Sequence, residues 1–191
     1  MRSVANSSDV GYLTTSSAAL QNLCHTQDIE ESPFFNIFTT VNLEPLKDAD
    51  ARTLIEEPAG AAGTPFGEEV DWILELGGRN PFLLQAAAGV AFDARTRGDG
   101  LDAGTLSDLA FEATRDYLEE FWEDLTEPQR QVLTAVQESK KIEARQRYAA
   151  ESLEQRGVLQ ADGDLRFQAG LVQRFVAGSG GRRGFFQRLF G

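Results

Sequence analysis

The sequence predicts a mostly helical protein with a small content of β structure. Three observations support this fold class. From residue 46 onward, apolar residues recur three and four positions apart, which is the spacing of one face of a helix. Signals for the start of a helix, such as Pro81 and the capping box of residues 126–129, occur within this pattern. Segments rich in aromatic and β-branched residues are few and short, so strands are a minor component.

The N-terminal part of the chain suggests two strands with a helix between them. Residues 10–15 form a short apolar run that ends in hydroxyl residues, and residues 34–43 are rich in aromatic and β-branched side chains. A short helix is expected over residues 16–23, capped by Ser16 or Ser17. Such a β-α-β step needs neighbouring strands to cover both faces of its sheet, and this sequence does not supply them.

A bundle of helices is expected between residues 46 and 124. Pro58 should stop the first helix, and Gly77-Gly78 should end the second. Pro81 suits the first position of the third helix, where its missing N–H costs nothing. The four helices predicted from the apolar spacing cover residues 48–57, 68–76, 81–97 and 105–124.

Residues 125–178 predict the winged-helix form of the helix-turn-helix. The turn between its two strands carries the Asp162-Gly163 hairpin signal. After this module, the basic and aromatic tail of residues 179–191 is expected to be flexible at its glycine-rich start. The expected elements of the module are, in order, a helix from the capping box, a helix over 145–155, strands over 156–160 and 165–167, and a helix over 171–176.

Charge and composition exclude several classes of protein. The chain has 191 residues and a net charge of -12, which opposes coating of nucleic acid or of an anionic membrane, because phosphates would be repelled. The single cysteine, Cys24, excludes an internal disulfide and a multi-cysteine zinc site. No apolar run of about 18 residues is present, and residues 1–6 lack the apolar stretch of a secretory signal. We therefore expect a cytoplasmic protein.

Four short motifs precede the winged-helix pattern. They are Thr14-Thr15-Ser16-Ser17, Ser32-Pro33-Phe34-Phe35-Asn36, Leu43-Glu44-Pro45-Leu46 and Gly78-Arg79-Asn80-Pro81-Phe82-Leu83-Leu84-Gln85. In this order, the sequence resembles bacterial STAND-type AAA+ ATPases, close to the origin-recognition branch and related to NOD-like receptors. The resemblance implies that residues 1–45 are the remnant C-terminal edge of an AAA+ nucleotide-binding core, 46–124 a helical lid domain and 125–178 a winged-helix domain.

The hydroxyl end of the first expected strand holds one candidate site. In the resembling family this position is sensor 1, which lies beside the γ-phosphate and orients the attacking water or reports the presence of the phosphate. Thr14, Thr15 and Ser16 match it. From the residues alone, the same hydroxyl groups finish a strand and cap a helix. Both interpretations stay open.

The start of the helix at Pro81 holds a second candidate site. In the resembling family a Gly-x-Pro element packs its proline on the adenine base. Gly78, Arg79, Asn80 and Pro81 match this element either with one extra residue between glycine and proline or with Arg79 in the glycine position. The resemblance thus implies that these four residues bind nucleotide, with Arg79 near the phosphates at a helix N-terminus. From the residues alone, Arg79 is a solvated loop arginine and Pro81 an ordinary helix-starting proline.

The motifs that grip a triphosphate and its metal are absent from the sequence. No Gly-x-x-x-x-Gly-Lys-Ser/Thr loop occurs, and no apolar strand ending in two acidic residues precedes the first expected strand. We therefore expect that this chain alone binds no metal, binds ATP or ADP only weakly, and does not hydrolyse ATP, although the intact family protein is an ATPase. The expected reason is a reading frame that starts inside the ATPase core, through a truncated gene, a split gene or a misassigned start.

No other arrangement of catalytic residues stands out. His25 is the only histidine, so any Ser-His-Asp catalytic triad would have to use it. Its neighbour Cys24 points in a different direction on most backbones, so a Cys–His nucleophile pair is not expected. Adjacent carboxylates on a helix do not face each other. We expect three such pairs to lie on solvated helix faces: Glu56-Glu57, Glu68-Glu69 and Glu119-Glu120.

These observations leave three functional hypotheses. The first is a regulatory lid and winged-helix region that contacts nucleotide and gates the ADP/ATP switch of the intact ATPase. Its expected partners are the missing N-terminal ATPase core or a homologous protomer, and a protein effector. The alternative is a winged-helix DNA-binding regulator, which is disfavoured because basic and acidic residues cancel along residues 143–156. The third is a remnant without activity.

The C-terminal tail could add one further contact. Arg182, Arg183 and Arg188 alternate with phenylalanine and leucine, which is the pattern of a short amphipathic segment that touches a membrane or a partner groove. Residues 179–191 are too few for stable anchoring in a membrane. A tail that folds back on the winged helix is the other interpretation.

Overall fold

The computed structural model describes residues 13, 15, 41 and 43–178. The chain divides into two compact units, Met1–Leu43 and Glu44–Gly191. The helix expected over residues 16–23 lies outside the described residues, as do almost all of the strands expected over 10–15 and 34–43. The helices and strands of the described residues all belong to the second unit.

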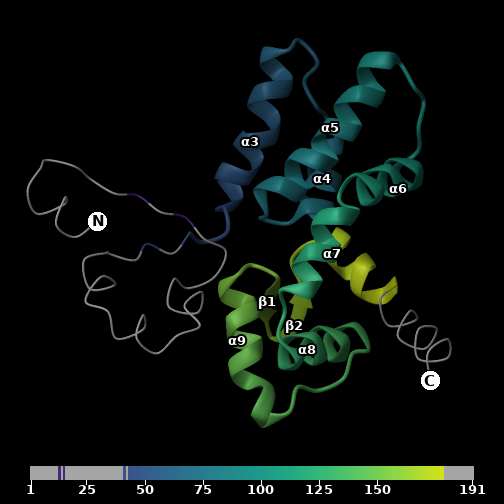
Figure 1. The fold of residues 1–191 in the computed structure, drawn as a ribbon. Coiled ribbons are helices and arrows are strands. Elements are labelled where there is room, and N and C mark those ends of the chain that lie inside the picture. The colour runs from purple at the N-terminus through teal and green to yellow at the C-terminus, as the bar shows by residue number, and fades with distance from the viewer. Residues whose placement is uncertain (1–12, 14, 16–40, 42, 179–191) are drawn as a thin grey trace, which may run out of the picture. The chain divides into compact units, whose positions relative to one another are not determined.

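The first half of this unit is a group of five helices, which we call the helical module (Figure 1). Helix α5 is its centre, because α3, α4 and α6 all pack against it. The largest fully buried side chains of this module include Ile73, Leu83, Leu84 and Leu118. The five helices are α3 (Asp48–Ala61), α4 (Glu69–Gly77), α5 (Pro81–Arg97), α6 (Ala103–Ala113) and α7 (Arg115–Glu123).

The second half, the hairpin module, contains a two-stranded antiparallel sheet. Leu159 lies opposite Phe167, and the two strands turn at Gly163, whose φ of 90° suits glycine. The elements of the module are α8 (Glu127–Gln137), the 3-10 helix η3 (Ala144–Gln146), α9 (Arg147–Gln155), β1 (Leu159–Asp162), β2 (Asp164–Phe167) and a final helix over residues 170–178. The predicted class, mostly helical with little β structure, is confirmed.

Strong local signals place two helix starts where they were predicted. Helix α5 begins at Pro81, and the Asn80 side chain caps it by accepting hydrogen bonds from the backbone N–H groups of Phe82 and Leu83. Helix α8 begins with the predicted capping box, in which the Thr126 N–H donates to Gln129 Oε1 at 2.9 Å.

Two predicted helix boundaries in the helical module are wrong. Helix α3 continues through Pro58 to Ala61, because Ile55 and Ala59 on its inner face are both buried in the core and hold its last turn. The single helix predicted over residues 105–124 is broken at Thr114, which separates α6 from α7. The buried Thr114 hydroxyl donates to the Ala110 carbonyl at 2.9 Å, a back-bond that commonly bends a helix.

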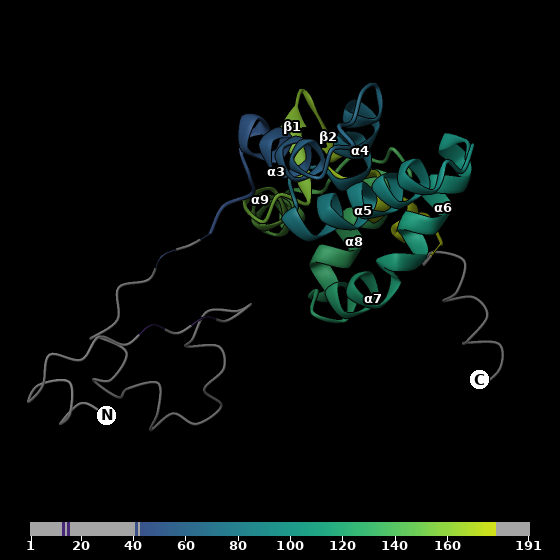
Figure 2. The ribbon, with the colours of Figure 1, turned by 90° about the horizontal axis from the view of Figure 1, so that it is seen from above.

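The two modules share one hydrophobic core. Its buried cluster joins Ile73 and Leu84 of the helical module to Leu133, Leu159 and Leu171 of the hairpin module. When the molecule is seen from above, the hairpin lies beside α3 and α4 (Figure 2). This contact brings the hairpin to the segment between α4 and α5, where the sequence places its second candidate site. Within residues 43–178, every helix is too short or too polar to cross a bilayer.

Acidification is expected to destabilise this unit through two acidic side chains at helix starts. The pKa of Asp102 is lowered mainly because the Thr105 backbone N–H donates to its carboxylate at the start of α6. The pKa of Glu69 is lowered because its own N–H and that of Gly67 donate to its carboxylate at the start of α4, with Arg95 adding to the effect. A depressed pKa in the folded state contributes stability that is present above the unfolded pKa and is lost as pH falls through the folded value.

The expected result is a free energy of unfolding that decreases steadily from about pH 6 to about pH 3, measured by urea titration at each pH. The variant Asp102→Asn keeps a capping side chain that does not titrate, so its pH dependence should be shallower. A free energy of unfolding that is constant over this range would contradict the expectation.

Candidate functional site

A polar cleft of about 720 Å³ lies between the start of α3, the end of α4 and the β1–β2 hairpin. It gathers side chains that are far apart in the sequence. Two of the four residues of the second candidate site, Gly78 and Arg79, line it. The charged and amide side chains of the lining are Asp48, Arg52, Arg79, Gln160, Asp162, Arg166 and Gln168.

Two adjacent glycines allow three backbone segments to meet beside this cleft. A Cβ atom on Gly77 would lie 2.7 Å from the backbone of Leu84, and one on Gly78 would lie 2.6 Å from the carbonyl oxygen of Gln168. Gly78 also has a φ of 62° with a ψ of -128°, a conformation that is essentially confined to glycine. Gly78 is therefore required where α4 ends against the last residue of the hairpin.

Arg79 is held at the cleft by two contacts. Its Nε donates to Asp48 Oδ1 at 2.8 Å, and its carbonyl oxygen accepts from the Leu46 N–H at 3.1 Å. Its side chain is 41% exposed, so the guanidinium lies at the rim of the cleft. The start of α3, whose cap residue Lys47 makes no side-chain hydrogen bond to it, lines the same cleft through Asp48. Arg79 thus brings a guanidinium, a group that suits anions, to this polar space, where the Asp48 carboxylate at the start of α3 is its present partner.

Asn80 and Pro81 lie at the start of α5. Pro81 is the first residue of this helix and is exposed. The Asn80 amide nitrogen donates to the Tyr117 hydroxyl at 2.8 Å, and the Tyr117 ring lies 4.5 Å from that of Phe82 between centroids. Tyr117 of α7 therefore fixes the orientation of the Asn80 side chain, a role that the apolar spacing of the predicted helix did not indicate.

Two further arginines in the cleft were not predicted. Arg52 of α3 donates to Asp71 at 2.7 Å, and this hydrogen bond is the main cause that raises the pKa of Arg52. Arg166 of β2 donates to Asp162 at 2.6 Å. With its amide oxygen turned toward the hairpin partner, Gln160 accepts from Arg166 Nε at 2.6 Å. Each of these two arginines is paired with an exposed aspartate.

The sensor-1-like residues all belong to the first unit of the chain, and their role stays a prediction. Thr14 and Ser16 lie outside the described residues, and Thr15 belongs to the first unit, where it is exposed and in no strand. Among residues 43–178, no three histidine, cysteine, aspartate or glutamate side chains gather as ligands of a metal ion. The part of the candidate site that the structure describes is therefore the cleft with residues 78–81.

Residues 1–142 match the family model described as Novel STAND NTPase 2, or nSTAND2. The match covers most of the chain and places it in the class of STAND NTPases. The chain belongs to the nSTAND2 family. No curated protein and no solved structure matches it. The match spans the whole helical module and α8, and it ends before η3, α9 and the hairpin.

Proposed function

We propose that this chain is the regulatory lid and winged-helix region of a STAND-type AAA+ ATPase. In this proposal residues 46–124 are the lid, 125–178 are the winged helix, and residues 78–81 contact ADP or ATP and gate the switch between them. The nucleotide is held mainly by a P-loop core, supplied by an N-terminal part or by a homologous protomer, since the sequence contains no P-loop. The observation that carries the proposal is the cleft, which combines Gly78 and Arg79 with the hairpin.

The chemistry of this cleft suits part of a nucleotide. Arginines recognise phosphate oxygens by charge-assisted hydrogen bonds, and helix N-termini favour anions. Arg79 stands in the loop before α5, and Pro81, two residues later, is exposed and offers an apolar face. Arg166 reaches the cleft from the hairpin. A phosphate bound there would touch both modules, which is what a nucleotide-dependent gate requires.

The charges of the hairpin module favour a winged helix that contacts another protein over a winged helix that binds DNA. Helices α8 and α9 followed by the β1–β2 hairpin have the order of a winged helix. On the candidate recognition helix, Arg145 is paired with Glu143 at 2.7 Å, and Arg147 is 3.9 Å from Glu151. The wing itself carries Asp162 at the cleft. Binding of the DNA backbone requires a surplus of basic residues, which these pairs do not provide.

The first test is a nucleotide titration of the isotope-labelled chain followed by NMR. We expect Mg-ADP to bind with a Kd in the millimolar range, since the cleft supplies arginines but no phosphate loop, so the titration should extend to about 10 mM. Shifts should concentrate at the backbone amides of residues 78–83 and around Arg166. Arg79→Ala should remove most of them, because it deletes the guanidinium nearest to the start of α5. ATP hydrolysis should stay at the background rate.

The matched control is Arg145→Ala, which removes an exposed, ion-paired arginine remote from the cleft lining. It should leave the titration unchanged. Shifts that spread over α9 instead of the cleft, or that survive in Arg79→Ala, would contradict the nucleotide contact. ATP turnover by the purified chain would contradict its role as a regulatory region. Tight, sequence-selective retardation of duplex DNA in a gel would favour the DNA-binding alternative.

A further inference from the structure

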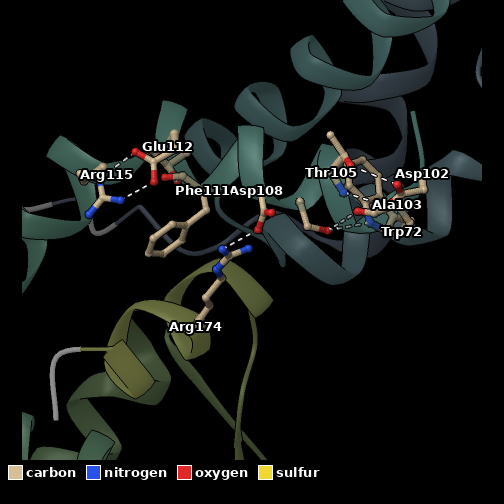
Figure 3. A network of polar contacts seen from close by, with 11 residues as sticks. Trp72, Asp102, Ala103, Thr105, Asp108, Phe111, Glu112, Arg115 and Arg174 are labelled. Carbon is tan, nitrogen blue, oxygen red and sulfur yellow. Dashed lines mark hydrogen bonds and ion pairs between the residues drawn. The ribbon is translucent and has the colours of Figure 1, made fainter. Parts of the chain in front are cut away.

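The final helix is joined to α6 by an ion pair that links residues far apart in the sequence. Arg174 Nη2 donates to Asp108 Oδ1 at 2.6 Å. Arg174 lies on residues 170–178 of the hairpin module, and Asp108 lies on α6 of the helical module (Figure 3). This contact therefore crosses the boundary between the two modules.

An aromatic ring strengthens the same contact. The Arg174 guanidinium carbon lies 4.5 Å from the centroid of the Phe111 ring, and that of Arg115 lies 5.4 Å from it. Figure 3 shows the Phe111 ring between the two arginines. Arg115 is itself paired with Glu112, one helical turn away. A guanidinium within about 6 Å of an aromatic centroid gains a cation–π interaction in addition to its ion pair.

The charges around Phe111 form a small network of two acids and two bases. The pKa of Glu112 is lowered mainly by its hydrogen bond from Arg115, and the positive charge of Arg174 lowers it further. The side chains of Arg174 and Asp108 are 44% and 68% exposed. Salt reaches such an exposed pair and weakens it, whereas it leaves buried apolar contacts intact.

Beside this network, the final helix packs four apolar side chains against the edge of the shared core. Leu171, Val172, Phe175 and Val176 are buried, and the Phe175 ring lies 6.1 Å from that of Trp122 between centroids. On the other face of the helix, Gln173 and Arg174 are exposed. The helix therefore has an apolar face toward the core and, at its edge, a polar contact with α6 through Arg174.

We propose that Arg174, Asp108 and Phe111 form an electrostatic latch that controls local detachment of the final helix from α6. With the latch formed, the helix stays docked and covers the edge of the shared core. When salt or substitution breaks it, the helix detaches more often while the remainder of the unit stays folded. The inference concerns the chain itself and is independent of the nucleotide proposal.

The test is amide hydrogen exchange, resolved by residue, on the full chain. Arg174→Ala and Asp108→Ala should each speed exchange over residues 171–178 by about threefold to tenfold, the range expected for an ion pair supported by a cation–π contact. The double variant should exchange no faster than the Arg174→Ala variant, since both changes remove the same contact. Raising the salt concentration to about 1 M should bring the unmodified chain close to the variants.

Three comparisons separate a latch from a general loss of stability. Arg174→Lys keeps the charge and should restore part of the protection. Arg97→Ala removes an exposed ion pair with Asp93 within α5 and should leave exchange over residues 171–178 unchanged. Amides in α5 should exchange at the same rate in the Arg174 and Asp108 variants as in the unmodified chain. Equal exchange of residues 171–178 with and without Arg174, or acceleration shared by α5, would overturn the latch.

Discussion

Replacing Gly78 by alanine is expected to lower the free energy of unfolding by about 2–4 kcal/mol, because backbone strain and overpacking act together. The φ of 62° and ψ of -128° at this residue exclude an ordinary side chain without strain. The added Cβ would also lie 2.6 Å from the carbonyl oxygen of Gln168, which is backbone and cannot rotate away. Either α4 or the end of the hairpin must move, and both line the cleft.

Urea titration followed by circular dichroism measures this change. The matched control is Gly98→Ala, at a glycine with a φ of 73° and open space around its Cβ position. That variant should cost only about 1 kcal/mol, since strain acts there without a clash. Equal losses in the two variants would show that the close approach to Gln168 does not contribute. In the nucleotide titration, Gly78→Ala should also weaken the shifts at residues 78–83.

Replacing Leu171 by alanine is the second large effect, with an expected loss of about 2–5 kcal/mol in the free energy of unfolding. Leu171 is completely buried at the start of the final helix and belongs to the core that both modules share. Its truncation leaves a cavity that the surrounding helices fill only in part. Thermal and urea unfolding should both report the loss.

The control for this substitution is Leu101→Ala, at a leucine that is 38% exposed in the loop before α6. Its expected cost is below about 1 kcal/mol, because little apolar surface is lost to water. A Leu171→Ala variant as stable as the unmodified chain would mean that the final helix does not contribute to the core. Comparison with Arg174→Ala separates the two attachments, since the latch residue should alter local exchange far more than global stability.

Local signals in the sequence were sufficient for part of the fold. Pro81 and the Thr126 capping box predicted helix starts because a missing N–H and a reciprocal cap act within one turn. The Asp162-Gly163 turn predicted the hairpin for a similar reason. The continuation of α3 past Pro58 and the break at Thr114 were missed, because burial of neighbouring side chains decides both.

The candidate site was predictable only where it is contiguous. Gly78 and Arg79 were predicted from the resemblance of residues 78–81 to a nucleotide-contacting element, and both line the cleft, whereas nucleotide binding stays a prediction. Arg52 and Arg166 are separated by more than half the chain, and only packing of the hairpin against α3 and α4 brings them to the same cleft. No local pattern in the sequence distinguishes them from solvated arginines. The same holds for Tyr117, which contacts Asn80 from a different helix.

Because the two modules share one core, the chain cannot be cut between them without exposing apolar side chains. Trp122 precedes the boundary between the helical and hairpin modules and Phe175 follows it, yet their rings pack together. Severing the chain there would leave each half with a newly exposed apolar surface, and such surfaces drive aggregation. Each module therefore depends on the other to cover its apolar surface, and any local opening must begin at an edge of the shared core, such as the final helix.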